Sequence, residues 1–238
     1  MTSTRGRRAL IGCGAAGSIG FLILFHLDAA TREGFVLLRH GPSLLMLGPG
    51  GWVQIVNFMV CGALMIACSA GLRAAGAGRW GPRLMAVYGG AMIGTAAFVT
   101  DPQLGFPPGT PSDRLPGTNA PETWHATLHT VAVMVLYAAA TAACAVFARR
   151  FRAQEGGRLW AAGLVVNAVA APVVLVVGAF YLQTESVGSR WFQLADGIAG
   201  RIIIPLGWVW AAAVSVRYLR TTPGSERNAP LARTDGRR

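Results

Sequence analysis

The sequence predicts an all-α membrane protein, a polytopic bundle of about six transmembrane helices with both termini in the cytoplasm. Three observations support this fold class. Hydrophobic residues make up 53% of the 238-residue chain and charged residues only 13%, whereas about 25% of the residues in a soluble domain are charged. Apolar runs of about 20 residues, the length that crosses a bilayer as a helix, recur along the chain. Arginine is concentrated in alternate connections between these runs, as the positive-inside rule predicts.

Six apolar runs are long enough to cross the bilayer, and they must be helices because backbone amides in lipid need partners within their own segment. The runs cover residues 9–27, 52–72, 82–100, 123–147, 158–181 and 202–219. Pro172 and Pro205 fall inside the last two runs, where we expect them to kink the helices. The first run follows Arg5, Arg7 and Arg8 but exceeds the apolar region of a signal peptide, so we interpret it as a retained span.

Small residues at four-residue spacing predict two close helix contacts. Gly12, Ala16 and Gly20 lie in the first run, and Gly90 and Gly94 lie in the third. Such residues let backbones approach each other in a membrane bundle. We therefore expect these glycines at helix interfaces, although the spacing specifies no partner helix.

The arginines predict the orientation of the bundle and its surroundings. With the N-terminus inside, 16 arginines fall on the cytoplasmic side and 5 on the outer side, which favours cytoplasmic termini. The net charge of +11 is distributed in short clusters between apolar runs, so the expected partner is membrane lipid and not nucleic acid. High arginine, alanine and glycine contents without lysine suggest the plasma membrane of a bacterium.

The chain is expected to form one domain followed by a tail. Residues 1–220 are predicted to be a single six-helix transmembrane domain. Residues 221–238 are polar and contain proline and several arginines, so we predict a disordered cytoplasmic tail. The sequence does not predict an oligomeric state.

The ionisable residues other than arginine gather on the predicted outer side. All four histidines (His26, His40, His125 and His129) fall at or just below the outer boundary, and seven of the ten acidic residues lie on the same side. Ionisable groups are costly in the bilayer core, so those at a helix end are either hydrated or paired. The outer face is therefore the predicted location of a functional site.

The densest group of these residues surrounds the start of the fourth run. His125 and His129 are four residues apart, so their imidazoles share one face of a helix. That face can present two nitrogens to one metal ion, with Asp101 as a third ligand and one position left for water. Water on a divalent metal such as zinc is a hydrolytic nucleophile. Asp101, His125 and His129 are thus candidate metal ligands or, without a metal, catalytic acid–base groups.

The same residues also have a structural interpretation. Two histidines at this spacing can instead donate hydrogen bonds between helices or lie at the headgroup level. The sequence lacks the glutamate of the His-Glu-x-x-His pattern found in zinc proteases. Metal binding, a metal-free substrate or proton site, and a structural role therefore all remain open.

Further residues on the outer side are candidates for binding a ligand. They are His26, His40, Glu122, Trp124 and Arg201. Asn119 is expected to cap the fourth helix, with Glu122 completing a capping box. Trp124 is typical of the aromatic belt at a membrane surface, and Arg201 is expected to pair with Asp196 or with a lipid phosphate.

Several motifs resemble those of a bacterial and archaeal family of integral membrane proteins, domain of unknown function 998. They are the Gly- and Pro-containing segment 43–52 followed by Asn57-Phe58, then Thr100-Asp101-Pro102, Thr123-Trp124-His125-Ala126-Thr127-Leu128-His129, and Gly197-Ile198-Ala199-Gly200-Arg201. The resemblance covers about residues 9–219, and Ala126 stands where the family commonly has glycine. It implies a fold and a topology but no reaction. Membrane hydrolases of the ceramidase and adiponectin-receptor type also carry histidine pairs and an aspartate near one leaflet, but they have seven spans and provide only an analogy.

Three functions are open from the sequence. The leading hypothesis is an outward-facing His/Asp pocket that binds or hydrolyses a lipid or another small amphiphile, with or without a metal. The second is a transporter or exporter of a small molecule or proton, for which Asn57 and Asn167 are the obvious polar groups within the spans. The third is a non-catalytic scaffold or signalling partner in which the cluster only holds helix ends together.

Overall fold

Six long helices account for the six apolar runs. In the computed structural model they are α1 (Thr4–Thr31), α2 (Gly51–Ala74), α3 (Trp80–Ala97), α4 (Trp124–Arg152), α5 (Arg158–Thr184) and α6 (Arg190–Thr221), with the short 3-10 helix η1 (Pro42–Met46) before α2. The structure describes the backbone of residues 3–37, 39–184 and 190–222, and their side chains except those of residues 175 and 177–203. No β-strand forms within these ranges. The predicted all-α fold is confirmed.

The helices have the length and surface of membrane-spanning segments. By length and composition α1, α2 and α4 can each cross a bilayer, and the segment Arg158–Val174 of α5 is a shorter apolar helix. Large apolar side chains point out of the bundle. Examples are Ile23, Val56, Val135 and Val166, whose exposed fractions lie between 42% and 64%. An exposed apolar surface around a whole bundle requires lipid as its solvent. The structure is therefore that of a helical membrane bundle.

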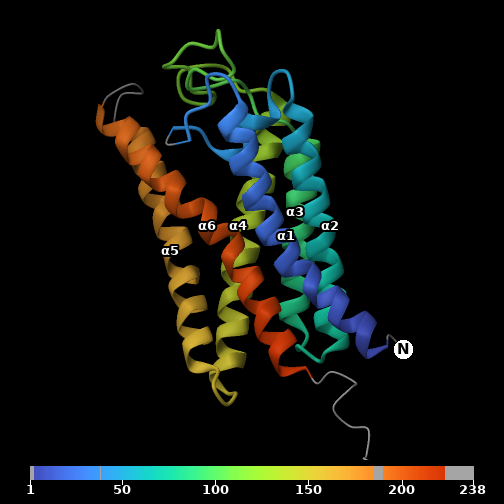
Figure 1. The fold of residues 1–238 in the computed structure, drawn as a ribbon. Coiled ribbons are helices and arrows are strands. Elements are labelled where there is room, and N and C mark those ends of the chain that lie inside the picture. Colours follow the sequence, from blue (N-terminus) through green and yellow to red (C-terminus); the bar gives the residue numbers. More distant parts are fainter. Residues whose placement is uncertain (1–2, 38, 185–189, 223–238) are drawn as a thin grey trace, which may run out of the picture.

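The six helices form a closed ring. Each packs against the next in sequence, α1 also packs against α6, and α4 touches α6 across the bundle. Figure 1 shows the start of α1 and the end of α6 at one end of the molecule, and the connections α1–α2 and α3–α4 at the other. We call these the inner end and the outer end, following the predicted orientation. This ring brings together side chains that lie far apart in the sequence.

Glycines allow the closest helix contacts, but they are not the glycines that the spacing predicted. A Cβ on Gly62 of α2 would lie 2.6 Å from the carbonyl oxygen of Gly89 on α3, and no real side chain tolerates that distance. Gly12, Gly20 and Gly90 have no such neighbour within 4 Å, and Gly94 makes only an ordinary contact. The prediction was wrong because several faces of these helices carry small residues. Which face is buried depends on the bulky residues beside them.

Five of the helices begin and end within five residues of the predicted runs, but α6 begins at Arg190, before the predicted start at residue 202. Pro172 and Pro205 lie inside α5 and α6, and the kinks expected there stay predictions. Helix α6 continues to Thr221, one residue into the predicted tail. Residues 223–238 of that tail lie outside the described residues.

Candidate functional site

Asp101 joins the segment that follows α3 to the first residue before α4. It lies just beyond the end of α3, and only 3% of its surface is exposed. One carboxylate oxygen accepts a hydrogen bond from the backbone N–H of Thr123 and the other accepts one from the Thr123 hydroxyl, both at 2.8 Å. Hydrogen bonds to a carboxylate are stronger than neutral ones. Asp101 therefore fixes where α4 begins.

Thr123 is the N-cap of α4, which corrects the sequence prediction. Its side-chain oxygen accepts from the backbone N–H of Ala126 at 3.4 Å. Asn119, the predicted cap, lies in the preceding loop, where its amide contacts the backbone of Leu115 and Asp113. The prediction failed because both residue types are good N-caps, and the contact with Asp101 that selects Thr123 is not local in sequence.

His125 and His129 do share one face of α4, and both rings turn toward the end of α3. The Nδ1 atom of His125 is 2.7 Å from the carbonyl oxygen of Val99 and 3.1 Å from the hydroxyl of Thr123. The Nδ1 atom of His129 is 2.6 Å from the carbonyl oxygen of Phe98 and 3.1 Å from that of Thr95. Since carbonyl oxygens can only accept, each Nδ1 carries the proton and donates.

These contacts satisfy backbone groups that a helix leaves without partners. The last carbonyls of any helix have no N–H within the helix to bind them. At the outer end of α3, His129 donates to such carbonyls, those of Thr95 and Phe98, whereas His125 donates to the carbonyl of Val99 just beyond the helix. His129 is almost fully buried, with 5% of its surface exposed. We call Asp101, Thr123, His125 and His129 the outer clamp, because together they hold the end of α3 against the start of α4.

Two other predicted residues lie beside the outer clamp but take no part in its hydrogen bonds. Glu122 is exposed and accepts a 3.3 Å hydrogen bond from the Thr127 hydroxyl, a contact within its own segment that differs from the predicted capping box with Asn119. Trp124 is 71% exposed, and its ring lies edge-on to Phe98. This exposure suits an aromatic anchor at the membrane surface.

His40 belongs to a different set of contacts, between the two outer loops. It is buried, its Nδ1 accepts from the backbone N–H of Val36, and its Nε2 donates to the carbonyl oxygen of Leu104 at 2.9 Å. Its ring packs against Phe35 and Phe106. Burial lowers the pKa of His40 below its ordinary value, and the neighbouring Arg39 guanidinium adds to the effect. His40 therefore binds the two loops to each other as a neutral imidazole.

The last two predicted binding residues do not join the cluster within the described structure. His26 is exposed on α1, and its Nδ1 donates to the carbonyl oxygen of Leu22 one turn earlier. Arg201 and its expected partner Asp196 lie outside the described side chains. The structure thus brings Asp101, His125 and His129 together and separates them from His26.

The comparison with protein families identifies the family of the chain. A family model described as protein of unknown function (DUF998) matches residues 15–217. The chain belongs to this family. The match includes the whole outer clamp, the four complete helices α2 to α5 and most of α1 and α6, so the resemblance seen in the motifs is confirmed. No curated protein and no solved structure matches the chain.

In this DUF998 protein the described residues do not form a complete metal site. Among the residues that the structure describes, no group of three or more His, Cys, Asp and Glu side chains lies close enough together to hold one ion. The two histidines face the same way, but both oxygens of Asp101 are directed at Thr123. The three predicted ligands are therefore neighbours that contact backbone and hydroxyl groups.

Sequence reasoning missed two residues that organise this end of the DUF998 protein. Thr123 could have been recognised, since a threonine directly before an apolar run is a favoured N-cap. For Arg32, nothing in the sequence apart from its charge predicts a structural role. Its guanidinium donates to the carbonyls of Leu45, Leu47 and Pro49 in the first outer loop, and it is 3.9 Å from the carboxylate of Asp28. An arginine counted for topology thus folds the loop before α2.

Proposed function

We propose that this DUF998 protein is a non-catalytic membrane scaffold and that its outer clamp holds helix ends together without performing chemistry. The observation that carries the proposal is the use of the clamp's polar atoms. Both oxygens of Asp101 and the Nδ1 atoms of both histidines bind groups on the neighbouring segment. Groups committed to such buried contacts stabilise a fold, because breaking them leaves unsatisfied partners.

The polar groups expected for transport are occupied in a similar way. The amide of Asn57 donates to the carbonyl oxygen of Phe21 on α1, and that of Asn167 donates to the carbonyl oxygen of Leu206 on α6. Both asparagines are buried. Hydrogen bonds of this kind are a common means of helix association in membranes, so they support packing and not a path for solutes.

A second candidate function, metal-assisted hydrolysis of a lipid or small amphiphile, is favoured by one specific feature. Metal-binding histidines usually donate one ring N–H to a carbonyl or carboxylate and bind the ion through the other nitrogen. His125 and His129 donate through Nδ1, which leaves the Nε2 atoms as the ligand positions. A zinc ion there needs a third ligand that the described residues do not bring into place.

Substitutions at His129 distinguish the two candidates. Asparagine places an amide N–H where Nδ1 lies, whereas glutamine places one where Nε2 lies, and neither amide is a good ligand for zinc. For a scaffold, His129→Ala and His129→Gln lower the free energy of unfolding in detergent by about 1–3 kcal/mol, and His129→Asn restores most of the loss. The measurement is thermal unfolding of the purified protein, with bound zinc determined on the same samples.

The opposite pattern supports the enzyme. Stoichiometric zinc in the wild type that disappears in all three variants, including the stable His129→Asn, would replace the scaffold proposal with the metal site. Equal stability of the Asn and Gln variants would show that the Nδ1 contact does not hold the bundle together.

A further inference from the structure

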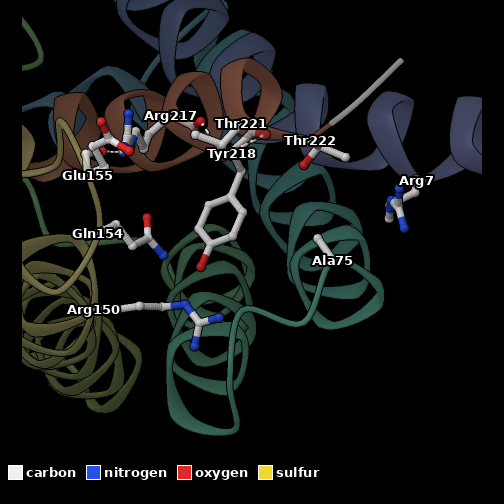
Figure 2. Close-up of a pocket in the computed structure, with 9 residues that line it drawn as sticks. All are labelled: Arg7, Ala75, Arg150, Gln154, Glu155, Arg217, Tyr218, Thr221 and Thr222. Atoms are coloured by element: carbon white, nitrogen blue, oxygen red, sulfur yellow. Dashed lines mark hydrogen bonds between the residues drawn. The ribbon is translucent and has the colours of Figure 1, made fainter. Parts of the chain in front are cut away.

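A cleft opens at the inner end of the bundle, opposite the outer clamp. Its volume is about 480 Å³, and its lining comes from the first turns of α1, the C-cap of α2, the last turns of α4 and α6, and the α4–α5 connection. Figure 2 shows the phenol of Tyr218 pointing toward the guanidinium of Arg150, with Gln154 beside them. Pockets of 300–1,000 Å³ are typical of small-molecule sites, so this cleft has room for a ligand.

The cleft is lined by more positive than negative charge. Arg7, Arg150 and Arg217 contribute three guanidinium groups, and among the described lining residues the only carboxylate is that of Glu155. The guanidinium of Arg217 donates a 2.7 Å hydrogen bond to the backbone carbonyl oxygen of Glu155, and not to its carboxylate. Within the described residues the only ion pair joins Arg32 and Asp28 at the outer end. The three arginines therefore have no carboxylate partner in the described part of the chain.

Several donors in the cleft have no partner among the described residues. These are the Nε atoms of all three arginines and the hydroxyl of Tyr218. Only 6% of the Tyr218 surface is exposed. Buried polar groups are nearly always hydrogen-bonded, and an exception calls for a ligand, ion or water as its partner. Here the unsatisfied groups can all donate and lie around one cleft, so the missing partner is a hydrogen-bond acceptor, and the three guanidinium groups favour a negatively charged one.

The helix ends do not cancel this preference. The carboxyl end of a helix carries about half a negative charge and the amino end about half a positive charge. Three carboxyl ends, of α2, α4 and α6, and one amino end, of α1, lie near the cleft. Arg8 offsets the end of α6 directly by donating to the carbonyls of Leu219 and Thr222 at 2.9 and 2.7 Å. Three further guanidinium groups leave the cleft positive.

We propose that this inner cleft binds a phosphate group, either of an anionic lipid headgroup or of a small soluble phosphate compound. The guanidinium fork matches a tetrahedral oxyanion and binds two of its oxygens at once. The tyrosine hydroxyl and the Gln154 amide supply neutral donors. Basic pockets between helix ends on the cytoplasmic side suit phospholipid headgroups. The cleft and the outer clamp are at opposite ends, so either proposal can fail without the other.

The binding experiment uses the full-length protein in neutral detergent and two separate probes. One probe is phosphatidylglycerol added to the micelles, compared with diacylglycerol of the same chains, which lacks the phosphate headgroup. The other probe is inorganic phosphate. A ligand that binds the folded state raises the unfolding midpoint by an amount that grows with the logarithm of its concentration relative to Kd. The midpoint against probe concentration gives an apparent Kd for each variant.

Matched substitutions connect the binding to the cleft. Arg150→Gln and Arg217→Gln are expected to weaken the apparent Kd at least about tenfold, since each removes a charged donor. Arg149→Gln removes the same charge from an exposed neighbour and is expected to change the apparent Kd by less than about twofold. Tyr218→Phe is expected to weaken the apparent Kd about threefold to tenfold and to leave the midpoint without ligand unchanged, because the hydroxyl has no partner to lose.

The outcomes assign the source of the phosphate or overturn the proposal. A response to phosphatidylglycerol alone identifies a lipid headgroup, and a response to inorganic phosphate identifies a soluble phosphate compound. No response to either probe overturns the proposal. It is also overturned if the Arg150, Arg217 and Tyr218 variants bind like Arg149→Gln.

Discussion

The polar groups of the outer clamp and of the inner cleft differ in whether they have hydrogen-bond partners within the chain. At the outer end, Asp101 and His129 are buried and their hydrogen bonds join one segment to the next. At the inner end, the hydroxyl of Tyr218 and the Nε atom of Arg150 are buried without partners among the described residues. Both ends are rich in ionisable groups, but the outer clamp is satisfied from within the chain, whereas these groups of the inner cleft are not.

This difference separates stability from binding. In a satisfied polar cluster, hydrogen bonds within the chain fix the geometry of each group. Removing one group leaves its partners buried without a hydrogen bond, which destabilises the folded state. An unsatisfied cluster contributes little to the folded state alone and gains its partners when a ligand arrives. Ionisable residues near a membrane surface are therefore weak indicators of function until the contacts of each are known.

Asp101→Ala is the largest expected perturbation of the outer end. The substitution leaves the N–H and the hydroxyl of Thr123 without their acceptor. We expect the free energy of unfolding to fall by about 2–4 kcal/mol, since two bonds to a charged group are lost together. Thermal or denaturant unfolding in detergent measures the loss. Asp113→Ala, which changes an exposed carboxylate in the same loop, is expected to cost less than about 0.5 kcal/mol.

An equal effect of the two substitutions would remove the distinction between the ends. It would mean that the carboxylate of Asp101 is solvated in the membrane-bound protein and that the clamp does not hold α3 to α4. Thr123→Ser, which keeps the hydroxyl, is the conservative companion and is expected to stay close to the wild type.

The sequence could predict the helices because lipid imposes a strong and local constraint. Every apolar run of about 20 residues must be helical to satisfy its backbone, and all six are. The helix contacts were less accessible. Gly12 and Gly90 have the spacing of an interface, yet close contacts form at other glycines, such as Gly62 and Gly89. Small residues permit contact on several faces, and only the packing of the whole ring selects one.

The candidate site was predictable in part for the same reason. Helical periodicity alone places His125 and His129 on one face. Their acceptors are the backbone carbonyls of Phe98 and Val99, at the end of α3. Residue type could not predict these acceptors, because every residue has a carbonyl. The inner cleft was not predictable at all. Arg7 and Arg217 meet there only because α1 closes the ring against α6.

A matched pair of tyrosines tests the comparison with one chemical change. Tyr88 is fully buried and its hydroxyl donates to the carbonyl oxygen of Gly207 on α6, whereas the hydroxyl of Tyr218 has no partner among the described residues. Tyr88→Phe is expected to lower the free energy of unfolding by about 1–2 kcal/mol. Tyr218→Phe is expected to change it by less than about 0.5 kcal/mol or to raise it. Unfolding in ligand-free detergent measures both.

The tyrosine comparison has a clear contrary result. A loss for Tyr218→Phe as large as that for Tyr88→Phe would indicate that the Tyr218 hydroxyl already has a partner in the free protein. The inner cleft would then belong with the outer clamp, as a set of groups that stabilises the fold.

The smallest expected effect is a dependence of stability on pH through His40. Burial lowers the pKa of His40 in the folded protein, whereas in the unfolded chain it has the ordinary value of about 6.5. Below that value the unfolded state binds more protons than the folded state, so stability falls as the pH drops. Above it both states are neutral and His40 adds no slope. Between pH 7.5 and 5.5 we expect the wild type to lose about 1 kcal/mol more than His40→Gln.

The His40 comparison isolates one group because all other ionisable groups are the same in both proteins and their contributions cancel in the difference. Glutamine keeps a donor for the carbonyl of Leu104 but cannot gain a charge. Parallel curves for the two proteins would show that the outer loops open to water and that His40 is not held as a neutral link. A steeper curve for the wild type below pH 6.5 would show that protonation disrupts the contact between Val36, His40 and Leu104. The hydrogen bonds of that contact would then stabilise the outer loops, as those of the outer clamp stabilise the helix ends.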